Sequence, residues 1–507
     1  MKNAHAVGID DMALYVPKLY LPIETLAKER QIEYVKLNKG LGLTHMSIPD
    51  VHEDAATMAA NAVSEIIDKN ELHPSDIGRI YLGTESALDG AKPTATYVVQ
   101  MLKQKYAPVY GENCFVNCDV VDLTFACVGG VDALHNTLDW VSGEEERIGI
   151  VVTSDFAKYE LASTGEYTQG AGAVALLVKH EPRLLVINNP IGVGMQSAHD
   201  FYKPLRTFSK KQIVEETLRL AGVEADAENV LDQLNGSLEV NGFIDDNDEV
   251  LTLHKDTPVF DGPYSNLTYQ NRIREAYEHF RKQAVKKEIL GAKESILHRW
   301  ERLIFHLPYA FHGKRIFSEI YMLEKMRTGA WDDFAVENAL EIPERSQFED
   351  EKTYGKAYSN FLRAITKTAD YRAMVKEKLE KAQRASGLVG NMYACSIFLA
   401  LMSTLQADLA EDADLADTKF GFFGYGSGSK SKVFEATVQP TWKAVVENFK
   451  LNEKLDSRTA IDYATYEQLH RKRLAKSVQT DNGKFAIASI GTEGVKLGAR
   501  YYELKSS

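Results

Sequence analysis

A cysteine at the start of a helical pattern is the first candidate for chemistry. In residues 122–134 an apolar, strand-like run turns into a helix around Cys127. Apolar residues at Val128, Val131 and Leu134 then follow a nearly helical period. In the first turn of a helix, free N–H groups and the helix dipole favour a thiolate, the usual nucleophile for accepting an acyl group as a thioester. Core packing is the alternative, because cysteine is commonly buried.

Two more candidates stand at the ends of predicted strands. Glu85 follows the apolar run 77–82, at the carboxyl end of a strand, where ligands gather in α/β sheets. Burial would raise the pKa of its carboxyl group and suit it to acid–base catalysis, although it could equally cap a loop amide. His306 ends the short apolar strand 302–306. A neutral imidazole there can donate a hydrogen bond to a carbonyl, or it is a satisfied core histidine.

Polar residues beside these strands are further candidates. Asn391 precedes an apolar helix, so it can serve as the N-cap, and its amide can also point at a substrate carbonyl. Lys314 and Arg315 follow His306 closely and either hold a phosphate or are ordinary solvated cations. We interpret the neighbouring His312 as a surface residue.

Composition narrows the class of protein. The chain has 507 residues, 44% of them hydrophobic, a net charge of -13 and four cysteines. With no apolar run of about 18 residues and no signal-like start, we expect a cytoplasmic protein without a membrane span. No Lys/Arg cluster is interleaved with aromatic residues, so we expect no nucleic-acid partner. Cys114 and Cys118 have no matching Cys/His cluster, so we expect no metal site.

The pattern along the chain predicts two similar halves. The first 200 or so residues alternate strand patterns (77–82 and 148–153) with a helical one (94–106), which indicates an α/β sheet. A glycine-rich turn enters a strand in residues 168–178 and again in 423–438. Neither turn opens a helix, so we interpret the glycines as allowing close backbone approach to a shared site rather than as a phosphate loop.

We therefore divide the chain into three parts. Residues 1–205 form an N-terminal half carrying Glu85 and Cys127, and residues 257–507 form a C-terminal half carrying His306, Asn391 and Ser427. Residues 206–256, which include the acidic stretch 244–249, are predicted to be an inserted surface decoration. The charged helical regions 275–297 and 350–384 are predicted to be solvated outer helices.

An ordered series of segments resembles the hydroxymethylglutaryl-CoA synthase family of thiolase-like condensing enzymes. The resemblance spans nearly the whole chain outside the insert. It implies a five-layer αβαβα core built from two similar halves, usually in a homodimer. The segments that carry it are residues 83–86, 126–130, 154–159, 168–173, 200–204, 305–308, 390–393 and 425–428.

The resemblance also implies roles for the three catalytic candidates. Cys127 would take an acetyl group from acetyl-CoA, and Glu85 would remove a proton from the acetyl methyl group. His306 would polarise the ketone of acetoacetyl-CoA, which the new carbanion attacks. Water would then release 3-hydroxy-3-methylglutaryl-CoA, as in the supply of isoprenoid precursors. No cofactor is implied, since the CoA thioesters are substrates.

The other matching positions fall into two groups. Residues expected to bind substrate are Thr164, Thr168, Ser265, Lys314, Arg315, Asn391 and Ser427. Residues expected to shape the site are Asp155, Tyr159, Asp200, Phe201 and Tyr393.

Three departures from the family keep alternatives open. Val128 stands where the family commonly has Tyr, Phe311 stands where it commonly has Lys, and the insert has no clear counterpart. A related enzyme that uses carrier-protein-bound β-ketoacyl chains in polyketide β-branching is therefore an alternative. A ketoacyl-carrier-protein synthase III would not require Glu85. A catalytically silent binding protein of this fold would have no reason to keep all three catalytic candidates.

Overall fold

A nine-stranded mixed sheet runs through the molecule in the order β13-β14-β15-β8-β1-β7-β6-β4-β5. The computed structural model describes residues 6–234, 250–479 and 482–506. The strands of the first half are β1 (Val7–Tyr15), β4 (Ile77–Gly83), β5 (Asp119–Leu123), β6 (Ile148–Ala157) and β7 (Gly170–His180). Those of the second half are β8 (Leu185–Met195), β13 (Trp300–Phe305), β14 (Lys419–Gly426) and β15 (Lys430–Val438).

The two halves of this sheet repeat one topology. β7 lies between β6 and β1, and β15 lies in the same way between β14 and β8. The two glycine-rich turns found in the sequence lead into β7 and β15, so they occupy equivalent places. The prediction of two similar halves is therefore confirmed. By strand order β8 already lies with the second half, while the division of the chain at residues 205 and 256 stays a prediction.

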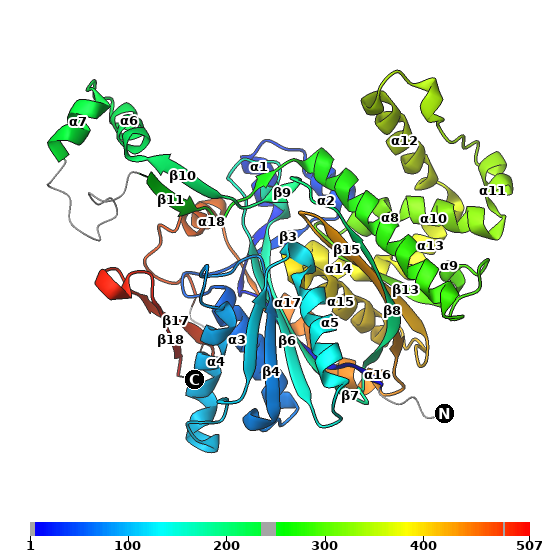
Figure 1. Cartoon of the computed structure of the whole chain (residues 1–507), viewed down its shortest axis with the longest axis horizontal. Helices are drawn as coiled ribbons and strands as arrows, with labels where there is room; N and C mark the ends of the chain where they lie inside the picture. Colours follow the sequence, from blue (N-terminus) through cyan, green and yellow to red (C-terminus); the bar gives the residue numbers. More distant parts are fainter. Residues whose placement is uncertain (1–5, 235–249, 480–481, 507) are drawn as a thin grey trace.

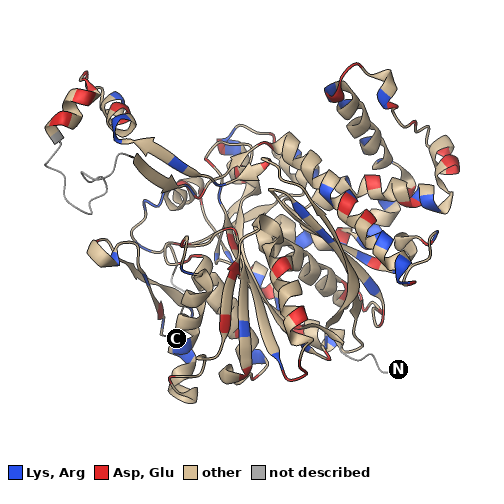
Figure 2. Ribbon diagram, viewed as in Figure 1, with Lys and Arg blue, Asp and Glu red and all other residues tan. Residues whose placement is uncertain are grey.

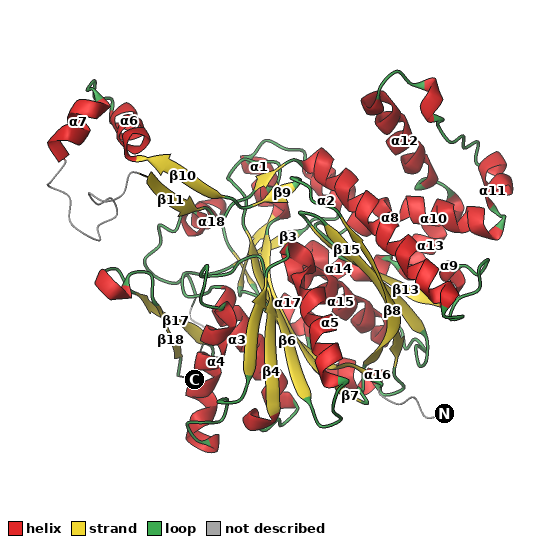
Figure 3. Ribbon diagram, viewed as in Figure 1, coloured by secondary structure: helices red, strands yellow, loops and turns green. Residues whose placement is uncertain are grey.

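Helices cover and separate the halves in layers (Figure 1, Figure 3). α3 (Ala55–Lys69) and α4 (Thr94–Tyr110) belong to the outer layer of the first half, where α3 packs on β1, β6 and β7. α5 (Gly129–Val141) and α15 (Ser396–Ala410) lie between the halves, while α8 (Gly262–Lys286) and α10 (His312–Thr328) lie outside the second. This is the thiolase-like αβαβα arrangement that the resemblance implied.

The remaining elements surround these layers. The other strands are β2 (Leu19–Pro22), β3 (His45–Ile48), β9 (Phe201–Tyr202), β10 (Leu205–Ser209), β11 (Val250–His254), β12 (Val259–Phe260), β16 (Thr459–Ala460), β17 (Phe485–Ile490) and β18 (Arg500–Leu504). The other α-helices are α1 (Ile23–Glu29), α2 (Tyr34–Leu41), α6 (Lys210–Ala221), α7 (Ala227–Leu234), α9 (Ile296–Arg299), α11 (Trp331–Glu337), α12 (Glu351–Ile365), α13 (Ala369–Lys378), α14 (Glu380–Val389), α16 (Trp442–Val446), α17 (Leu451–Asp456) and α18 (Tyr463–His470).

The central helix α15 is apolar on all sides because it is enclosed by protein. Its side chains from Ser396 to Leu405 are all buried. Among the described residues, the stretch Tyr393–Ala410 alone is long and apolar enough to span a membrane, and 78% of it is buried inside the molecule. Such burial is typical of a core helix of a large domain.

The outer helices are less solvated than the sequence suggested. Charged residues are spread along α8 (Figure 2), but its inner face, with Tyr269, Tyr277 and Phe280, is buried against the second half of the sheet. Two of its basic residues, Arg272 and Arg281, are buried as well. The prediction that residues 275–297 and 350–384 are simply solvated is therefore wrong for their inner faces. The many charged residues of these segments made the apolar stripe along each helix difficult to recognise from the sequence.

The insert forms an arm that stands away from the layers (Figure 1). Its described residues comprise β10 and β11, which pair with each other, and helices α6 and α7. α6 has no buried residue. The short β9–β12 pair lies at the base of the arm. The acidic stretch 244–249 lies outside the described residues.

Candidate active site

Cys127 lies at the junction of β5 and α5, as the sequence predicted. A short 3-10 turn, η2 (Ala126–Val128), leads into α5, and Ala126 adopts a positive φ of 39°. The end of β4 closely approaches the start of α5, directly after this turn: a Cβ on Gly83 would lie 2.4 Å from the backbone N of Gly130. Glycine is needed at this contact because any side chain would push the turn away from the strand.

Cys127 and Glu85 form a hydrogen-bonded pair. The Cys127 thiol donates to Glu85 Oε1 over 2.9 Å, and Cys127 is only 8% exposed. Burial raises the pKa of the Cys127 thiol well above its usual value, and the Glu85 and Asp155 carboxylates raise it further. The prediction of a thiolate favoured by the helix dipole is therefore wrong for this state. Desolvation and two nearby carboxylates outweigh the dipole, and Glu85 is placed to take the thiol proton.

Glu85 itself is tuned by opposing influences. Burial raises the pKa of its carboxyl group, while the Lys203 ammonium and the Cys127 hydrogen bond lower it. Lys203 Nζ lies 3.9 Å from Glu85 Oε2 and donates to the Glu85 carbonyl oxygen over 2.9 Å. A raised pKa makes the carboxylate a stronger base, and the ammonium keeps it able to ionise. Sequence reasoning gave Lys203 no role, although it stands three positions after Asp200 in a family segment.

Asp155 connects the two halves of the site. Its Oδ1 accepts hydrogen bonds from the Thr84 hydroxyl at 3.0 Å, the Glu85 backbone N–H at 2.9 Å and the Ser86 hydroxyl at 2.9 Å. Its Oδ2 accepts from the backbone N–H of Ala394, in the second half, at 2.9 Å. Burial, followed by the nearby Glu85, raises the pKa of Asp155 to about 7. Asp155 thus fixes the Glu85 loop to the start of α15.

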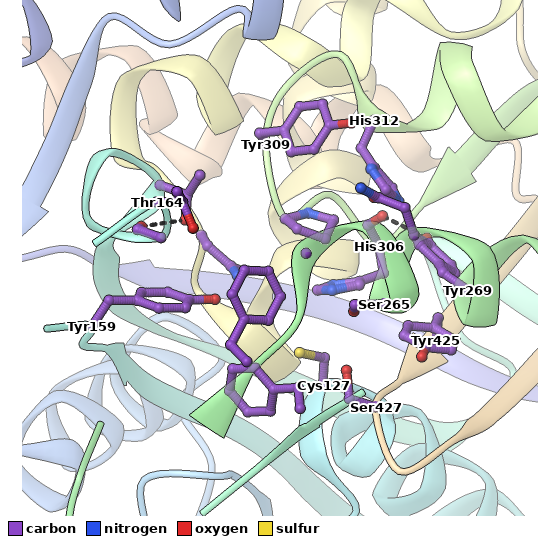
Figure 4. A pocket seen from close by; sticks show the side chains of 18 of the residues that line it. Cys127, Tyr159, Thr164, Ser265, Tyr269, His306, Tyr309, His312, Tyr425 and Ser427 are labelled. Atoms are coloured by element: carbon purple, nitrogen blue, oxygen red, sulfur yellow. Dashed lines mark hydrogen bonds between the residues drawn. The ribbon is translucent and has the colours of Figure 1, made fainter. Parts of the chain in front are cut away.

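His306 is a buried, neutral imidazole at the end of β13. It is 1% exposed, and burial lowers its pKa to about 3. Its backbone is held on both sides, since its N–H donates to the Phe423 carbonyl at 3.0 Å and its carbonyl accepts from the Tyr269 hydroxyl at 2.8 Å. In Figure 4 its ring faces the cavity that Cys127 also lines. A neutral imidazole so placed can polarise a carbonyl.

Asn391 lies in the turn before α15 but is not the N-cap of this helix, which is Cys395, so the predicted N-cap role is wrong. Its Oδ1 accepts from the backbone N–H of Tyr393 at 2.9 Å and from the Ser396 hydroxyl at 3.1 Å, which stabilises the turn before α15. The residue also lines the cavity, so its NH₂ group is the part left for a ligand.

Most of the predicted residues share one cavity of about 350 Å³. Of the predicted set, the cavity is lined by Cys127, Tyr159, Thr164, Thr168, Phe201, Ser265, His306, Arg315, Asn391, Tyr393 and Ser427. Glu85 reaches Cys127 from the other side and lines a second cavity of about 720 Å³ with Lys203. Lys314 does not line the first cavity, because its ammonium lies over the Phe311 ring.

Two groups hold the walls of the cavity. Buried Asp200 accepts hydrogen bonds from the Tyr425 hydroxyl at 2.6 Å, the Gly428 N–H at 2.9 Å and the Ser265 hydroxyl at 3.3 Å. The aromatic rings of the second group pack together beside Cys127. They are Tyr159, Phe201 and Tyr393.

One residue was placed wrongly from the sequence. His312, predicted to lie at the surface, is 2% exposed and lines the cavity. It is the first residue of α10, and the turn before the helix points it inward onto Tyr269, where the rings stack at 4.5 Å. The local sequence, a histidine followed by a glycine and two cations, does not indicate that the His312 side chain points inward.

The fold and the site together define a class of protein. A cysteine paired with a buried carboxylate, opposite a neutral histidine and between two αβα halves, can accept an acyl group and form a carbon–carbon bond beside it. Among the described residues, no group of three or more His, Cys, Asp or Glu could hold a metal ion. These are the features of a thiolase-like condensing enzyme.

Comparisons with known proteins specify the family. The family model described as hydroxymethylglutaryl-coenzyme A synthase N terminal matches residues 3–182, and its C-terminal counterpart matches residues 251–486. The chain therefore belongs to the hydroxymethylglutaryl-CoA synthase family and is an enzyme of this type. The synthase of Haloferax volcanii is 29% identical, over 92% of this chain and 91% of the relative. That of Enterococcus faecalis is 25% identical, over 96% and 97%.

Solved structures support the same fold. MvaS in complex with 3-hydroxy-3-methylglutaryl coenzyme A superimposes with a TM-score of 0.73 at 23% identity, covering 100% of both chains. The HMG synthase of the curacin biosynthetic pathway, in complex with holo donor-ACP, gives 0.69 at 19% identity, covering 98% of this chain and 99% of that one. At these identities, the likeness concerns the fold.

Proposed function

We propose that the protein condenses acetyl-CoA with acetoacetyl-CoA and water to give 3-hydroxy-3-methylglutaryl-CoA and CoA. The observation that carries this proposal is the 2.9 Å hydrogen bond between the Cys127 thiol and Glu85 Oε1, opposite neutral His306. A nucleophile, a base and a carbonyl-polarising group are what a condensation through an acyl-enzyme requires.

The first step transfers the acetyl group. Glu85 accepts the thiol proton as Cys127 Sγ attacks the thioester carbonyl of acetyl-CoA. The C–S bond to CoA breaks, and the CoA thiolate leaves with that proton.

The second and third steps form the new bond and release the product. Glu85, again a carboxylate, removes a proton from the acetyl methyl group, and the resulting carbanion attacks the ketone of acetoacetyl-CoA. His306 polarises that ketone, and Glu85 returns its proton to the new alkoxide. Water then cleaves the Cys127 thioester, giving a carboxylic acid and the free thiol.

The identity of the thioester carrier is the finer part of the proposal. Curated relatives named as hydroxymethylglutaryl-CoA synthases, together with Arg315 at the cavity, support CoA. Phe311, where the family commonly has Lys, favours the second candidate, an enzyme that uses a carrier protein. The lysine that follows, Lys314, lies over this ring and outside the cavity lining.

A parallel assay distinguishes the two carriers. The protein, preloaded with acetyl-CoA, is offered either acetoacetyl-CoA or an acetoacetyl-carrier protein, and product formation is followed for both. We expect turnover with acetoacetyl-CoA. Turnover with the carrier-bound substrate alone would contradict the preferred substrate while leaving the chemistry intact.

Further features of the proposal concern the setting of the enzyme. We propose that it works without a cofactor, in the cytoplasm, in isoprenoid precursor supply. We also propose a homodimer, a state that light scattering can measure. β5 supports this, because among the described residues it is an edge strand of the nine-stranded sheet and can pair with a second copy.

A further inference from the structure

His312 is a buried polar side chain that the mechanism above does not use. Its imidazole is 2% exposed and lines the cavity, yet neither Nδ1 nor Nε2 has a hydrogen-bond partner among the described residues. Burying two polar ring nitrogens without hydrogen-bond partners costs free energy. Because these nitrogens lie at a cavity, a bound ligand can supply the missing hydrogen bonds.

Neighbouring rings fix the orientation of this imidazole. It stacks on Tyr269 with ring centroids 4.5 Å apart and an angle of 10°, and it forms a T-shaped pair with Tyr309 at 4.8 Å and 84°. Tyr269 is in turn stacked on Tyr425 at 4.2 Å, and its hydroxyl donates to the His306 carbonyl. The stack on Tyr269 thus holds one face of the His312 ring, and both ring nitrogens are left without a hydrogen-bond partner among the described residues.

The charge state of His312 selects the kind of ligand. Burial lowers its pKa well below the usual value, and neighbouring His306 and Arg315 lower it further. A neutral imidazole offers one donor and one acceptor. A secondary amide is complementary, since its carbonyl accepts and its N–H donates, whereas a phosphate offers acceptors alone at neutral pH.

The place of His312 in the cavity indicates which amide is bound. Figure 4 shows Cys127 and Ser427 at one end of the cavity, His306 between, and Tyr309 and His312 at the other end. Exposed Arg315 lines the cavity as well. A thioester whose carbonyl reaches Cys127 therefore passes its arm along His312.

We propose that His312 binds an amide of the pantetheine arm of the incoming thioester. The inference rests on the proposed function in that it requires thioesters in this cavity. It does not depend on the choice of carrier, because CoA and carrier proteins present the same arm. His312 is then a substrate-binding residue that discriminates between thioesters with and without amides.

Acyl donors that differ in their amides test this proposal. The rate of Cys127 acetylation is measured with acetyl-CoA, S-acetylpantetheine and the amide-free S-acetyl-2-mercaptoethanol, for the wild-type protein, His312→Leu and His312→Gln. We expect His312→Leu to lower kcat/KM about 5- to 20-fold with the two amide-bearing donors and to leave the amide-free donor unchanged. His312→Gln, which keeps one donor and one acceptor, should restore part of the loss.

Each alternative result has a distinct meaning. An equal loss with all three donors, or no loss with any, would overturn the role of His312 in amide binding. Two controls check that the site is intact in each variant. The thermal unfolding temperature should match that of the wild-type protein, and the amide-free donor should acetylate Cys127 at the wild-type rate. Absence of acetylation of the wild-type protein by acetyl-CoA would instead overturn the proposed function itself.

Discussion

The starts of α5 and α15 are equivalent places in the two halves, yet only one carries the proposed nucleophile. Each helix begins with a 3-10 turn, η2 (Ala126–Val128) or η5 (Tyr393–Cys395). The first residue of each turn has a positive φ, 39° at Ala126 and 44° at Tyr393. The second residue is Cys127 in the first half and Ala394 in the second. Asp155, from the first half, accepts the backbone N–H of Ala394.

Each half also supports the helix start of the other. A Cβ on Gly426, in β14, would lie 2.8 Å from the backbone N of Val128, next to Cys127. A Cβ on Gly170, in β7, would lie 2.7 Å from the carbonyl oxygen of Asn391. The predicted close approach of the glycine-rich turns to a shared site is thus confirmed. One local structure thus occurs twice: in the first half it carries the proposed nucleophile, and in the second half it binds Asp155 beside the site.

The largest effect should come from removing the thiol at the first helix start. We expect Cys127→Ala to abolish condensation, by about 10⁴-fold or more in kcat, because no acyl-enzyme can form. Cys395→Ala is the matched control, since Cys395 is a buried cysteine in the equivalent turn. It should lower stability by about 1 kcal/mol and leave kcat nearly unchanged. Product formation measures kcat for both variants. A comparable loss of kcat in both would contradict the proposed difference between the two helix starts.

Removing the base should separate acyl transfer from condensation. We expect Glu85→Gln to become acetylated, though more slowly because the thiol loses its proton acceptor, and to condense about 10²- to 10⁴-fold more slowly. Cys127 acetylation and product formation are measured on the same sample. Loss of acetylation with unimpaired condensation of a preloaded enzyme would assign Glu85 to the first step alone.

Breaking the link between the halves should affect stability as well as activity. Asp155→Ala removes the acceptor of four hydrogen bonds, including those from the backbone N–H groups of Glu85 and Ala394, so we expect the free energy of unfolding to fall by about 2–5 kcal/mol. Denaturant unfolding measures this change, and Asp155→Asn, which keeps one acceptor oxygen, should lose less. A variant of unchanged stability would show that Asp155 does not connect the two helix starts energetically.

Changing the cation beside Glu85 should shift a pH profile. The Lys203 ammonium lowers the pKa of Glu85, so Lys203→Met should raise it. The reaction needs the carboxylate, so the acid limb of kcat/KM against pH should move to higher pH. Lys203→Arg, which keeps the charge, should move it less. If the acid limb does not move in Lys203→Met, Lys203 does not control the pKa of Glu85 and has only a packing role.

The smallest effect is expected from the arm at the junction of the halves. α6 has no buried residue, and β10 pairs with β11 of the same arm. Replacing residues 206–253 by a short Gly/Ser linker, with the β9–β12 pair kept, should therefore leave kcat and KM nearly unchanged. A marked loss of condensation would contradict the interpretation of the insert as a surface decoration.

The success of sequence reasoning depended on whether a property is local. Strand and helix periods are local, so the places of Glu85, Cys127 and His306 at element ends could be predicted. The charge state of Cys127 depends on burial and on Glu85, 42 residues away in the chain, and the prediction of a thiolate was wrong. His312 was missed because its orientation depends on contacts with Tyr269 of α8, an element distant in sequence.

Acetylation of Cys127 is the most direct test of the central claim that the first helix start carries the acyl group. The protein is incubated with acetyl-CoA alone, quenched in acid, digested and examined by peptide mass spectrometry. We expect one acetyl group, on the peptide that contains Cys127. Hydroxylamine, which cleaves thioesters, should remove it. An unmodified Cys127 in a protein that still condenses, or an acetyl group on another residue, would contradict the account.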